Sequence, residues 1–403
     1  MPSPNELWIE APSLEQDRLT LAATLEAPDG SRRRLWYRLP AEQQPALIGS
    51  ADPFVVGVLF RAMRSPFDLR VHGRVSPELL RNLAELMSAW NAWYPRRYHR
   101  IGILADEERE TPPPAGGRAV LGFSSGFDST FTVWQHCSGY AGRLQVDLAA
   151  GVMIQGFDIP LDEPEGFERA LQKARRTLAS VGLELIPIAT NFRELGQNWF
   201  DSHGAGLASC LMLLAGRYAT GLIASGYKYS NVPLPPAGTN PITDWMFSSG
   251  AFRIRSDGSA YTKIEKLRLM YGWTEGMNSL RTCWAGPEWD ANCCRCAKCT
   301  WSILAFRIAG LPRPASFPRD ISNRDILRLR LTDYAETRSL SLLAREARQA
   351  GIHASWVRAL ELCVWLNLQR LTFQNKHPAW GLARRLYRLL LPPFEEKEEP
   401  AAL

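Results

Sequence analysis

Apolar and polar residues alternate in short segments through the middle of this chain. Between residues 119 and 225, compact apolar runs are separated by longer stretches with the period of an amphipathic helix. The apolar runs, each a strand candidate, are residues 119–123, 144–154, 183–189 and 221–225. The helical stretches begin near Ser129 and cover 165–181 and 206–218. This alternation indicates βαβ units, and therefore an α/β fold with a parallel sheet.

The first 110 residues have a different pattern, which predicts a small α+β domain. Residues 18–25 and 35–39 are strand candidates joined by a turn at Asp29-Gly30, and Ser76-Pro77 opens an amphipathic helix. Residues 111–118 contain three prolines and two glycines, which indicates a linker. We see no catalytic constellation before this linker, so a structural or partner-binding role is expected there.

From about residue 320 the chain has helical patterns and no strand signal. Amphipathic segments cover 339–349 and 355–371, a basic amphipathic segment covers 380–391, and residues 395–403 form an acidic tail. The predicted organisation is therefore an N-terminal α+β domain (1–110), a linker (111–118), an α/β domain (119–315) and a helical extension (316–403).

Composition adds limits to this picture. The 403 residues are 46% apolar and 22% charged, as in an ordinary soluble globular protein. No run of 18 apolar residues predicts a membrane span, and the first residues carry no secretory signal, so we expect a cytoplasmic protein. The net charge of +6 permits an anionic ligand and leaves nucleic-acid binding open without requiring it.

The segment after the first strand of the α/β region carries the clearest candidate chemistry. It joins a strand to a helix N-terminus, where backbone N–H groups and the helix dipole favour an anion. Its serine and threonine hydroxyls add further donors, and it lacks the lysine of a Walker A loop. The residues that we expect to bind phosphate are Ser124, Ser125, Gly126, Phe127, Asp128, Ser129 and Thr130.

This segment resembles the pyrophosphate-binding loop of the PP-loop ATP pyrophosphatases, whose signature is Ser-Gly-Gly-x-Asp-Ser. The one departure is Ser125, where the family usually has glycine. The resemblance implies a HUP-like parallel sheet and a loop that holds the β and γ phosphates of ATP while the α-phosphate is attacked. It also implies that Asp128 orients the loop or a Mg²⁺ ion.

Two other interpretations of the same segment stay open. Gly122-x-Ser124-x-Gly126 also fits the nucleophile elbow of α/β-hydrolases, with Ser124 as nucleophile and a later histidine such as His203, His353 or His377 as base. That interpretation leaves Asp128 and Ser129 unexplained. Alternatively, the segment is a Ser/Gly turn that caps a helix and binds nothing.

The cysteines are concentrated in one short region. Five of the eight lie within residues 283–299, and without a secretory signal a metal site is more plausible than a disulfide framework. The predicted ligands of a structural zinc ion are Cys283, Cys293, Cys296 and Cys299. An iron–sulfur cluster, free or redox-active thiols, and Cys294 as an alternative ligand remain open.

A PP-loop followed by Cys-x9-Cys-x2-Cys-x2-Cys resembles 7-cyano-7-deazaguanine synthase and its relatives over residues 118–310. In those ligases ATP activates a carboxylate on a deazaguanine, ammonia aminates it, and dehydration gives a nitrile, with zinc held by four cysteines. The resemblance implies ATP, Mg²⁺ and Zn²⁺, a small-molecule or macromolecular carboxylate substrate, and ammonia or an amine. Extended relatives occur in defence and specialised pathways, so a non-catalytic nucleotide-binding module and a homodimer are further expectations.

The resemblance implies more site residues outside the loop. Met153 and Ile154, at the end of the second strand, would meet adenine, although Met153 is equally explained as a core residue. Ser225 and Gly226 follow the fourth strand and so lie on the same ligand-binding edge of the sheet. Lys263, in a Thr-Lys-x-Glu segment, would stabilise the leaving pyrophosphate, although a plain helix N-terminus also accounts for it.

Overall fold

The computed structural model describes residues 3–230, 234, 236–283, 285–332 and 334–373. These residues form two compact units, one ending at Thr262 and the other beginning at Lys263. We call the first the sheet unit and the second the cysteine unit. The predicted amphipathic segment 380–391 and the acidic tail 395–403 lie outside the described residues. Among the residues that are described, no helix is both long and apolar enough to span a membrane.

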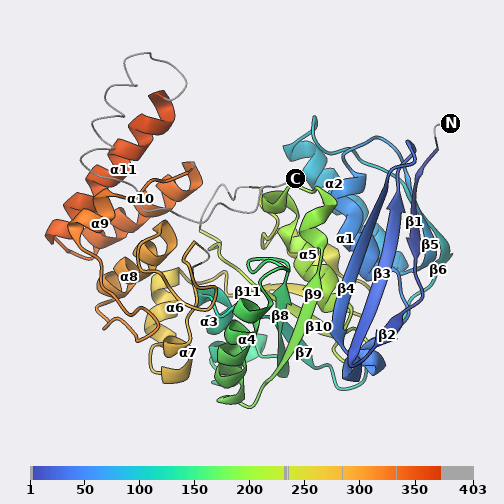
Figure 1. The fold of residues 1–403 in the computed structure, drawn as a ribbon, viewed down its shortest axis with the longest axis horizontal. Helices are drawn as coiled ribbons and strands as arrows, with labels where there is room; N and C mark the ends of the chain where they lie inside the picture. The colour runs from blue at the N-terminus through green and yellow to red at the C-terminus, as the bar shows by residue number, and fades with distance from the viewer. Residues whose placement is uncertain (1–2, 231–233, 235, 284, 333, 374–403) are drawn as a thin grey trace. The chain divides into compact units, whose positions relative to one another are not determined.

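The sheet unit is built on one eleven-stranded sheet with two differently organised halves (Figure 1). The first half is entirely parallel and has the order β11-β10-β7-β8-β9. Its strands are β7 (Ala119–Gly122), β8 (Leu148–Gln155), β9 (Glu184–Thr190), β10 (Thr220–Ala224) and β11 (Arg253–Asp257). The predicted α/β class with a parallel sheet is thus confirmed.

The second half continues the same sheet in the order β4-β3-β1-β5-β6, with β2 paired to β3. Its strands are β1 (Asn5–Ile9), β2 (Ser13–Glu15), β3 (Arg18–Glu26), β4 (Arg32–Pro40), β5 (Leu69–Val75) and β6 (Ile103–Glu108). The pairs β4–β3 and β3–β1 are antiparallel, whereas β1–β5 and β5–β6 are parallel. Residues 111–118 contain no helix or strand, in keeping with a connecting segment.

The two halves are joined by a short antiparallel pairing of β4 with β9, in which Tyr37 lies opposite Thr190. Side chains extend this junction: Asn191 Oδ1 accepts from the Trp36 N–H at 2.9 Å, and Asn191 Nδ2 donates to the Arg34 carbonyl at 2.8 Å. The boundary predicted at residue 110 therefore does not coincide with a break in the sheet, because the N-terminal strands complete the edge of the parallel half.

Helices cover both faces of the parallel half (Figure 1). The helices α3 (Phe127–Cys137) and α4 (Pro164–Ala179) connect β7 to β8 and β8 to β9. Since crossover connections are right-handed, they cover one face, and α5 (Trp199–Met212), whose connection runs back across the sheet, covers the other. These helices pack closely on the sheet. A Cβ added at Gly122 would meet Leu207 of α5, and one added at Gly151 would meet Leu178 of α4.

The face covered by α5 also holds the main hydrophobic core. Here α1 (Asp52–Ala62) packs on α5, and α2 (Pro77–Trp93) contributes Leu79, Leu83, Leu86 and Trp90. As predicted, Ser76 caps α2 by accepting from the Leu79 N–H at 3.4 Å. The sequence analysis did not find α1, because ten of its eleven residues are buried and a helix that is apolar all round has no amphipathic signal.

Strand order creates one special position in the sheet. The chain moves from β7 outward through β8 to β9, then returns to place β10 on the other side of β7. The connections after β7 and after β10 therefore leave the sheet on opposite faces, and the crevice between them at the carboxyl ends of the strands is where such folds bind ligands. Two of the predicted segments, at Ser124 and at Ser225, follow these two strands.

The cysteine unit is helical in its described part. Its helices are α6 (Lys263–Met270), α7 (Thr274–Asn278), α8 (Ala297–Ala309), α9 (Asn323–Leu327), α10 (Tyr334–Gln349) and α11 (Ser355–Phe373). The helices predicted at 339–349 and 355–371 correspond to α10 and α11. The prediction was wrong at two helix starts in the sheet unit: α3 begins at Phe127 rather than near Ser129, and α5 begins at Trp199 rather than at 206, because Asn198 caps it.

Candidate functional site

The turn between β7 and α3 is closed by its own hydroxyl groups. Ser129 Oγ accepts from the Ser124 N–H at 3.3 Å and donates to the Gly126 carbonyl at 3.2 Å. Ser124 Oγ accepts from the Gly126 N–H at 3.3 Å. Gly126 then stands as the N-cap of α3 with no side chain above the helix end. The segment is thus a compact turn that leads directly into a helix N-terminus, the geometry that favours an anion.

Ser125 has an unusual backbone in this turn. Its φ is +61°, in the left-handed region, although the residue is not glycine. This is the position at which the sequence departs from the PP-loop signature, and a serine side chain there costs about 1 kcal/mol relative to an unstrained backbone. The turn therefore keeps the conformation that glycine would adopt freely, and Ser125 is nearly buried within it.

A second turn, after β10, lies against the first. A Cβ placed on Gly226 would stand 3.7 Å from Asp128 Oδ2, so the two turns meet at the crevice between β7 and β10. Ser225 is buried, and its Oγ accepts from the Tyr227 N–H at 3.2 Å and donates to the Tyr227 carbonyl at 3.0 Å. The structure thus brings together the predicted groups at Asp128 and at Ser225-Gly226.

The other predicted residues of the sheet unit differ in what they offer a ligand. Phe127 and Thr130 are buried in α3, so they support the turn and expose little side chain. Met153 is only 3% exposed in β8, and Ile154 is half-buried and packs on the main core. The side chain of Met153 is therefore a core residue of β8. The backbone of β8 continues past Met153 toward the carboxyl edge of the sheet.

Lys263 belongs to the cysteine unit, whose first described residue it is. It begins α6, and its ammonium group lies over the ring of Trp301, 5.2 Å from the ring centre. The structure therefore groups Lys263 with α8 of its own unit. Its proposed role toward pyrophosphate stays a prediction.

Of the three histidines considered for the hydrolase interpretation, only His203 lies in the described part of the sheet unit. His203 is half-buried in α5, where its Nε2 lies 3.2 Å from Thr239 Oγ1 and its Nδ1 faces backbone carbonyls. Burial lowers the pKa of His203. His353 lies in the cysteine unit beside Arg348, and His377 lies outside the described residues. The hydrogen bonds of His203 thus join it to α5 and to Thr239.

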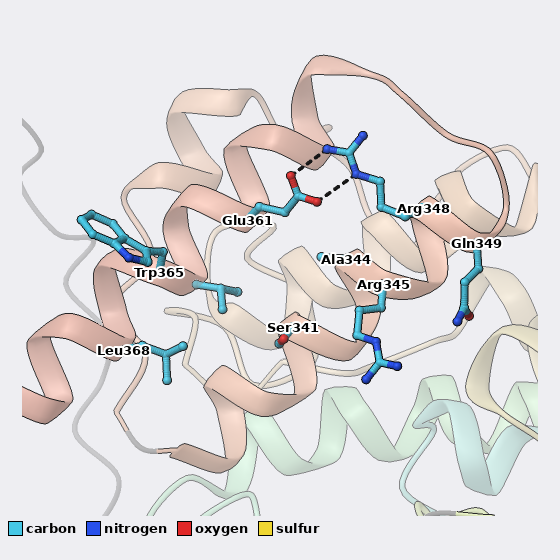
Figure 2. A pocket seen from close by; sticks show the side chains of 9 residues that line it. Ser341, Ala344, Arg345, Arg348, Gln349, Glu361, Trp365 and Leu368 are labelled. Atoms are coloured by element: carbon cyan, nitrogen blue, oxygen red, sulfur yellow. Dashed lines mark hydrogen bonds and ion pairs between the residues drawn. The ribbon is translucent and has the colours of Figure 1, made fainter.

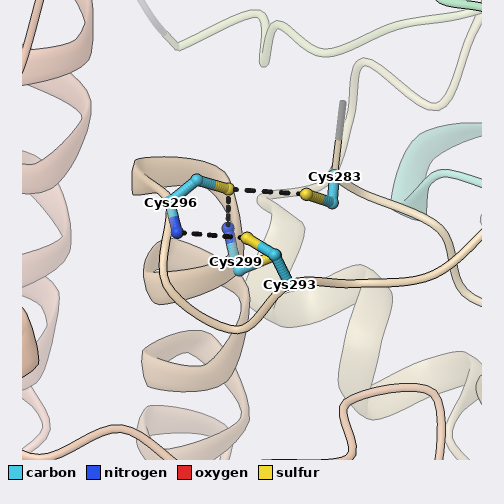
Figure 3. A group of neighbouring side chains, drawn as sticks. All are labelled: Cys283, Cys293, Cys296 and Cys299. Atoms are coloured by element: carbon cyan, nitrogen blue, oxygen red, sulfur yellow. Dashed lines mark hydrogen bonds between the residues drawn. The ribbon is translucent and has the colours of Figure 1, made fainter. Parts of the chain in front are cut away.

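The four predicted cysteines converge in the cysteine unit (Figure 3). All four sulfur atoms lie within 4.8 Å of one another. Cys283 Sγ is 3.8 Å from Cys296 Sγ, and Cys293 Sγ is 3.9 Å from Cys299 Sγ. Four sulfurs placed tetrahedrally around one ion with bonds of 2.3 Å would be about 3.8 Å apart. The group therefore fits a single metal ion such as zinc better than a cluster, whose several irons would hold the sulfurs farther apart.

The loop that carries these cysteines aims backbone N–H groups at the sulfurs. Cys293 Sγ accepts from the N–H groups of Arg295 and Cys296 at 3.4 Å, and Cys296 Sγ accepts from the Cys299 N–H at 3.4 Å. Cys296 thereby serves as the N-cap of α8. These bonds stabilise negative charge on sulfur and fix the spacing Cys-x2-Cys-x2-Cys as a turn followed by a helix.

The pKa values of the four thiols respond strongly to one another. Hydrogen bonds from Cys293 and its neighbours hold the pKa of Cys283 far below its usual value. Hydrogen bonds with the Cys283 sulfur raise the pKa of Cys296 and of Cys299. Without a cation the group cannot ionise all four thiols, because each new thiolate repels the others. A bound divalent ion removes that repulsion and favours four thiolates.

Sequence reasoning missed two residues that support the metal group. Asn292 is buried and joins the segment of Cys283 to the segment of Cys293. Its Oδ1 accepts from the Thr282 and Cys283 N–H groups. Its Nδ2 donates to the Leu280 and Ser316 carbonyls. Gly286 leaves room, since a Cβ there would be 2.9 Å from Cys293 Cβ. Cys294 turns away, with φ of +56° and its Sγ toward the Asn292 carbonyl, so it is not a fifth ligand.

The cysteine unit also contains a groove of about 450 Å³ between α10 and α11 (Figure 2). Arg348 and Glu361 form a bidentate ion pair across it, with distances of 2.9 Å and 2.7 Å. Trp365 and Leu368 lie along its other end and are exposed. None of the residues predicted to bind ATP or metal lines this groove.

Comparisons with family models, with curated proteins and with solved structures give no match to this chain. The features of this chain that indicate a function are therefore the turn at Ser124, its neighbour at Ser225 and the four cysteines.

Proposed function

We propose that this protein uses ATP to adenylate a carboxylate, releasing pyrophosphate, and then transfers the activated acyl group to ammonia or an amine. The observation that carries the proposal is the Ser124–Ser129 hydroxyl turn, which meets the Gly226 turn where the strand order reverses. A pyrophosphate at this position would lie against backbone donors and the positive end of α3. The motif resemblance to PP-loop ligases gives the reaction class.

The proposed reaction has two balanced steps. A substrate carboxylate oxygen attacks the α-phosphorus of ATP, the bond to the β-phosphate oxygen breaks, and pyrophosphate leaves with an acyl-adenylate formed. The nitrogen of ammonia or an amine then attacks the acyl carbon, the bond to AMP breaks, and the nitrogen loses a proton to give an amide. Holding the phosphates rigidly supplies both alignment and charge stabilisation.

The residues of the two turns have distinct proposed roles. Ser124, Ser125, Gly126 and Ser129 hold the β and γ phosphates through hydroxyl and backbone groups. Asp128, which is half-buried beside Gly226, orients the turn or a Mg²⁺ ion. When bound, Mg²⁺ would neutralise phosphate charge. Ser225 and Gly226 border the α-phosphate, and Lys263 is proposed to stabilise the leaving pyrophosphate.

We assign a structural zinc ion to Cys283, Cys293, Cys296 and Cys299. The sulfur spacing near 3.8 Å supports this assignment, together with the N–H groups aimed at the sulfurs. Four protein ligands leave no open position for a substrate, so zinc would stabilise the fold of its unit.

The direct test uses ATP labelled at the α-phosphate with a panel of carboxylates and ammonium, beginning with 7-carboxy-7-deazaguanine. We expect AMP and pyrophosphate as products and no ADP. Asp128→Asn and Ser129→Ala should each reduce turnover at least 100-fold, because they remove groups at the proposed phosphate site. A matched control is Glu78→Gln, which removes a carboxylate from the first turn of α2 and belongs to neither of the two turns.

Three outcomes would contradict the proposal. Formation of ADP would show a different bond being cleaved. Labelling of Ser124 by a fluorophosphonate probe would favour the hydrolase interpretation. Binding of α,β-methylene-ATP without turnover of any carboxylate, and with no effect of Asp128→Asn, would favour a non-catalytic nucleotide-binding module.

A further inference from the structure

A buried polar cluster lies at the end of α3 that is farthest along the chain from the phosphate turn. Its centre is Asp257, the last residue of β11, whose side chain is 6% exposed. His136 Nε2 lies 3.3 Å from Asp257 Oδ1, and the imidazole side chain has no exposed surface. Gln135 Nε2 donates to Asp257 Oδ2, and Arg255 Nη2 donates to Oδ1 at 3.1 Å. The proposed reaction uses none of these four residues.

The hydrogen bonds fix the state of the imidazole. The Val146 N–H donates to His136 Nδ1 at 3.3 Å, so Nδ1 is an acceptor and the ring proton sits on Nε2. The Nε2–H then donates to the Asp257 carboxylate. Burial raises the pKa of Asp257, but the bond from His136 and the charge of Arg255 outweigh it and hold that pKa below its ordinary value. An ionised carboxylate therefore ties the last turn of α3 to β11.

The same residue also holds the second turn of the candidate site. The Asp257 carbonyl accepts from the Ser225 N–H at 2.8 Å. Ser225 Oγ in turn closes the turn at Tyr227. Asp257 thus bonds to α3 through its side chain and to the Ser225 turn through its backbone. Asp257 therefore connects α3, which begins at the first turn, with the Ser225 turn.

We propose that Asp257 and His136 are positioning residues that hold the two phosphate-facing turns in register. This inference rests on the proposed function, because the two turns matter together only if they share a phosphate ligand. When the pair is removed, α3 and the Ser225 turn lose their common anchor, although no group that touches ATP is changed. The expected result is weaker nucleotide binding with local loosening of the turns.

The experiment uses the full chain, with α,β-methylene-ATP and Mg²⁺ as the probe. Calorimetry gives its Kd, and hydrogen exchange of the ligand-free protein follows residues 123–130 and 225–229. His136→Phe keeps the ring size but removes both nitrogens, so we expect Kd to rise at least tenfold and both segments to exchange faster. His136→Gln retains a donor that can reach Asp257, so its Kd should stay within about threefold.

Two further variants guard against a simple folding defect. Asp257→Asn keeps the size of the side chain but leaves a single acceptor oxygen for Gln135, His136 and Arg255. We therefore expect the same increases in Kd and in exchange of the two turns as for His136→Phe. This variant provides the measurement if His136→Phe does not fold. Tyr37→Phe is the matched control: it removes a buried hydroxyl bond to Ser209 of 2.8 Å, away from α3. It should lower the melting temperature without changing Kd or the exchange of the two turns.

The outcomes separate this inference from the proposed function. If wild type does not bind the analogue, the proposed function fails, and the ligand-free exchange data still decide the positioning role. If wild type binds and Asp257→Asn leaves both Kd and turn exchange within twofold, the pair is only structural and the inference is wrong. An increase in exchange that is uniform over the sheet unit, and not concentrated in the two turns, would also overturn it.

Discussion

The two candidate sites share one backbone feature and differ in what completes them. Among the described residues, three non-glycine residues have a positive φ, and two of these are Ser125 in the turn between β7 and α3 and Cys294 in the cysteine loop. In each case a strained residue turns the chain sharply so that its neighbours point at a common centre. The turn at Ser125 is closed by hydrogen bonds of the Ser124 and Ser129 hydroxyls, whereas the loop at Cys294 brings four thiols within 4.8 Å of one another.

This difference has a physical consequence. A turn closed by hydroxyl and backbone hydrogen bonds can keep its shape before any ligand arrives, because these bonds lie within the turn itself. Four sulfurs held within 4.8 Å carry mutual repulsion once they ionise, so their arrangement is stable only with a cation among them. Changes at the phosphate turn should therefore affect binding, and changes at the cysteines should affect folding.

The largest expected effect is loss of the metal. Zinc bound by four thiolates contributes on the order of 10 kcal/mol to the fold of a small unit, so Cys296→Ser or a strong chelator should unfold the cysteine unit. Elemental analysis should give one zinc per chain before treatment, and hydrogen exchange over residues 263–373 should then increase. The sheet unit should keep its protection.

A matched control for this experiment is Cys363→Ser, which removes a buried thiol from α11 without touching the metal group. It should retain zinc and most of its protection. Iron in place of zinc, or a Cys296→Ser variant that keeps both metal and protection, would contradict the assignment.

The second effect is a pH dependence of opposite sign in the two units. In the sheet unit Asp244 is buried, with one oxygen accepting from the Asn240 N–H at 2.7 Å, and burial raises its pKa from 3.8 to about 7. Between these values the folded state holds a proton that the unfolded state has lost, so stability falls as pH rises, by up to about 1.4 kcal/mol per pH unit. Zinc binding in the cysteine unit instead strengthens with pH, because thiols must lose protons.

Denaturant titrations between pH 5 and 8, with hydrogen exchange reporting on each unit, measure the two slopes. Asp244→Asn should reduce the falling slope of the sheet unit and leave the part due to Asp52, whose pKa burial raises to about 6, and the exposed Asp147→Asn should leave the whole slope in place. A sheet unit that becomes more stable from pH 5 to 7 would contradict the role given to Asp244.

A smaller effect is expected from relieving strain at Ser125. Glycine adopts a φ of +61° freely, and the Ser125 hydroxyl makes no hydrogen bond within the described residues, so Ser125→Gly should stabilise the sheet unit by about 1 kcal/mol. Cys294→Gly should gain less, since it loses a buried thiol that bonds the Asn292 carbonyl. Thermal unfolding compares the two variants, and destabilisation by Ser125→Gly would show that its side chain holds the turn.

The smallest effect should come from the ion pair of Arg348 and Glu361 in the α10–α11 groove (Figure 2). Its partners are partly exposed, and pairs of this kind contribute little because solvent screens them. Arg348→Ala should leave the melting temperature of the metal-bound protein nearly unchanged, in low and in high salt. A clear loss would mean that surface pairing, and not the metal, holds this unit.

Much of the parallel half could be predicted from the sequence because its signals are local. The apolar runs gave four of its five strands, and the turn residues at Ser124 stand directly between strand and helix. In the fifth strand, β11, only Ile254 and Asp257 are buried, and three of its five residues are charged. No apolar run therefore marks this strand. Likewise α1 lacks a polar face, and the positions of Asn292 and Gly286 acquire meaning only beside Cys283 and Cys293.

By itself the sequence determined the chemistry: hydroxyls and an aspartate at a strand-to-helix turn, and four cysteines at metal-binding spacing. Those depend on residue type and short-range order, which periodicity and turn geometry preserve. Only the tertiary structure decided that the N-terminal strands extend the same sheet through β4 and β9, and that Gly226 meets Asp128. It alone joined Asp257 to the last turn of α3 and to the Ser225 turn. These contacts join residues far apart in the chain, and pairing across such distances is fixed by packing and hydrogen bonding of the whole sheet.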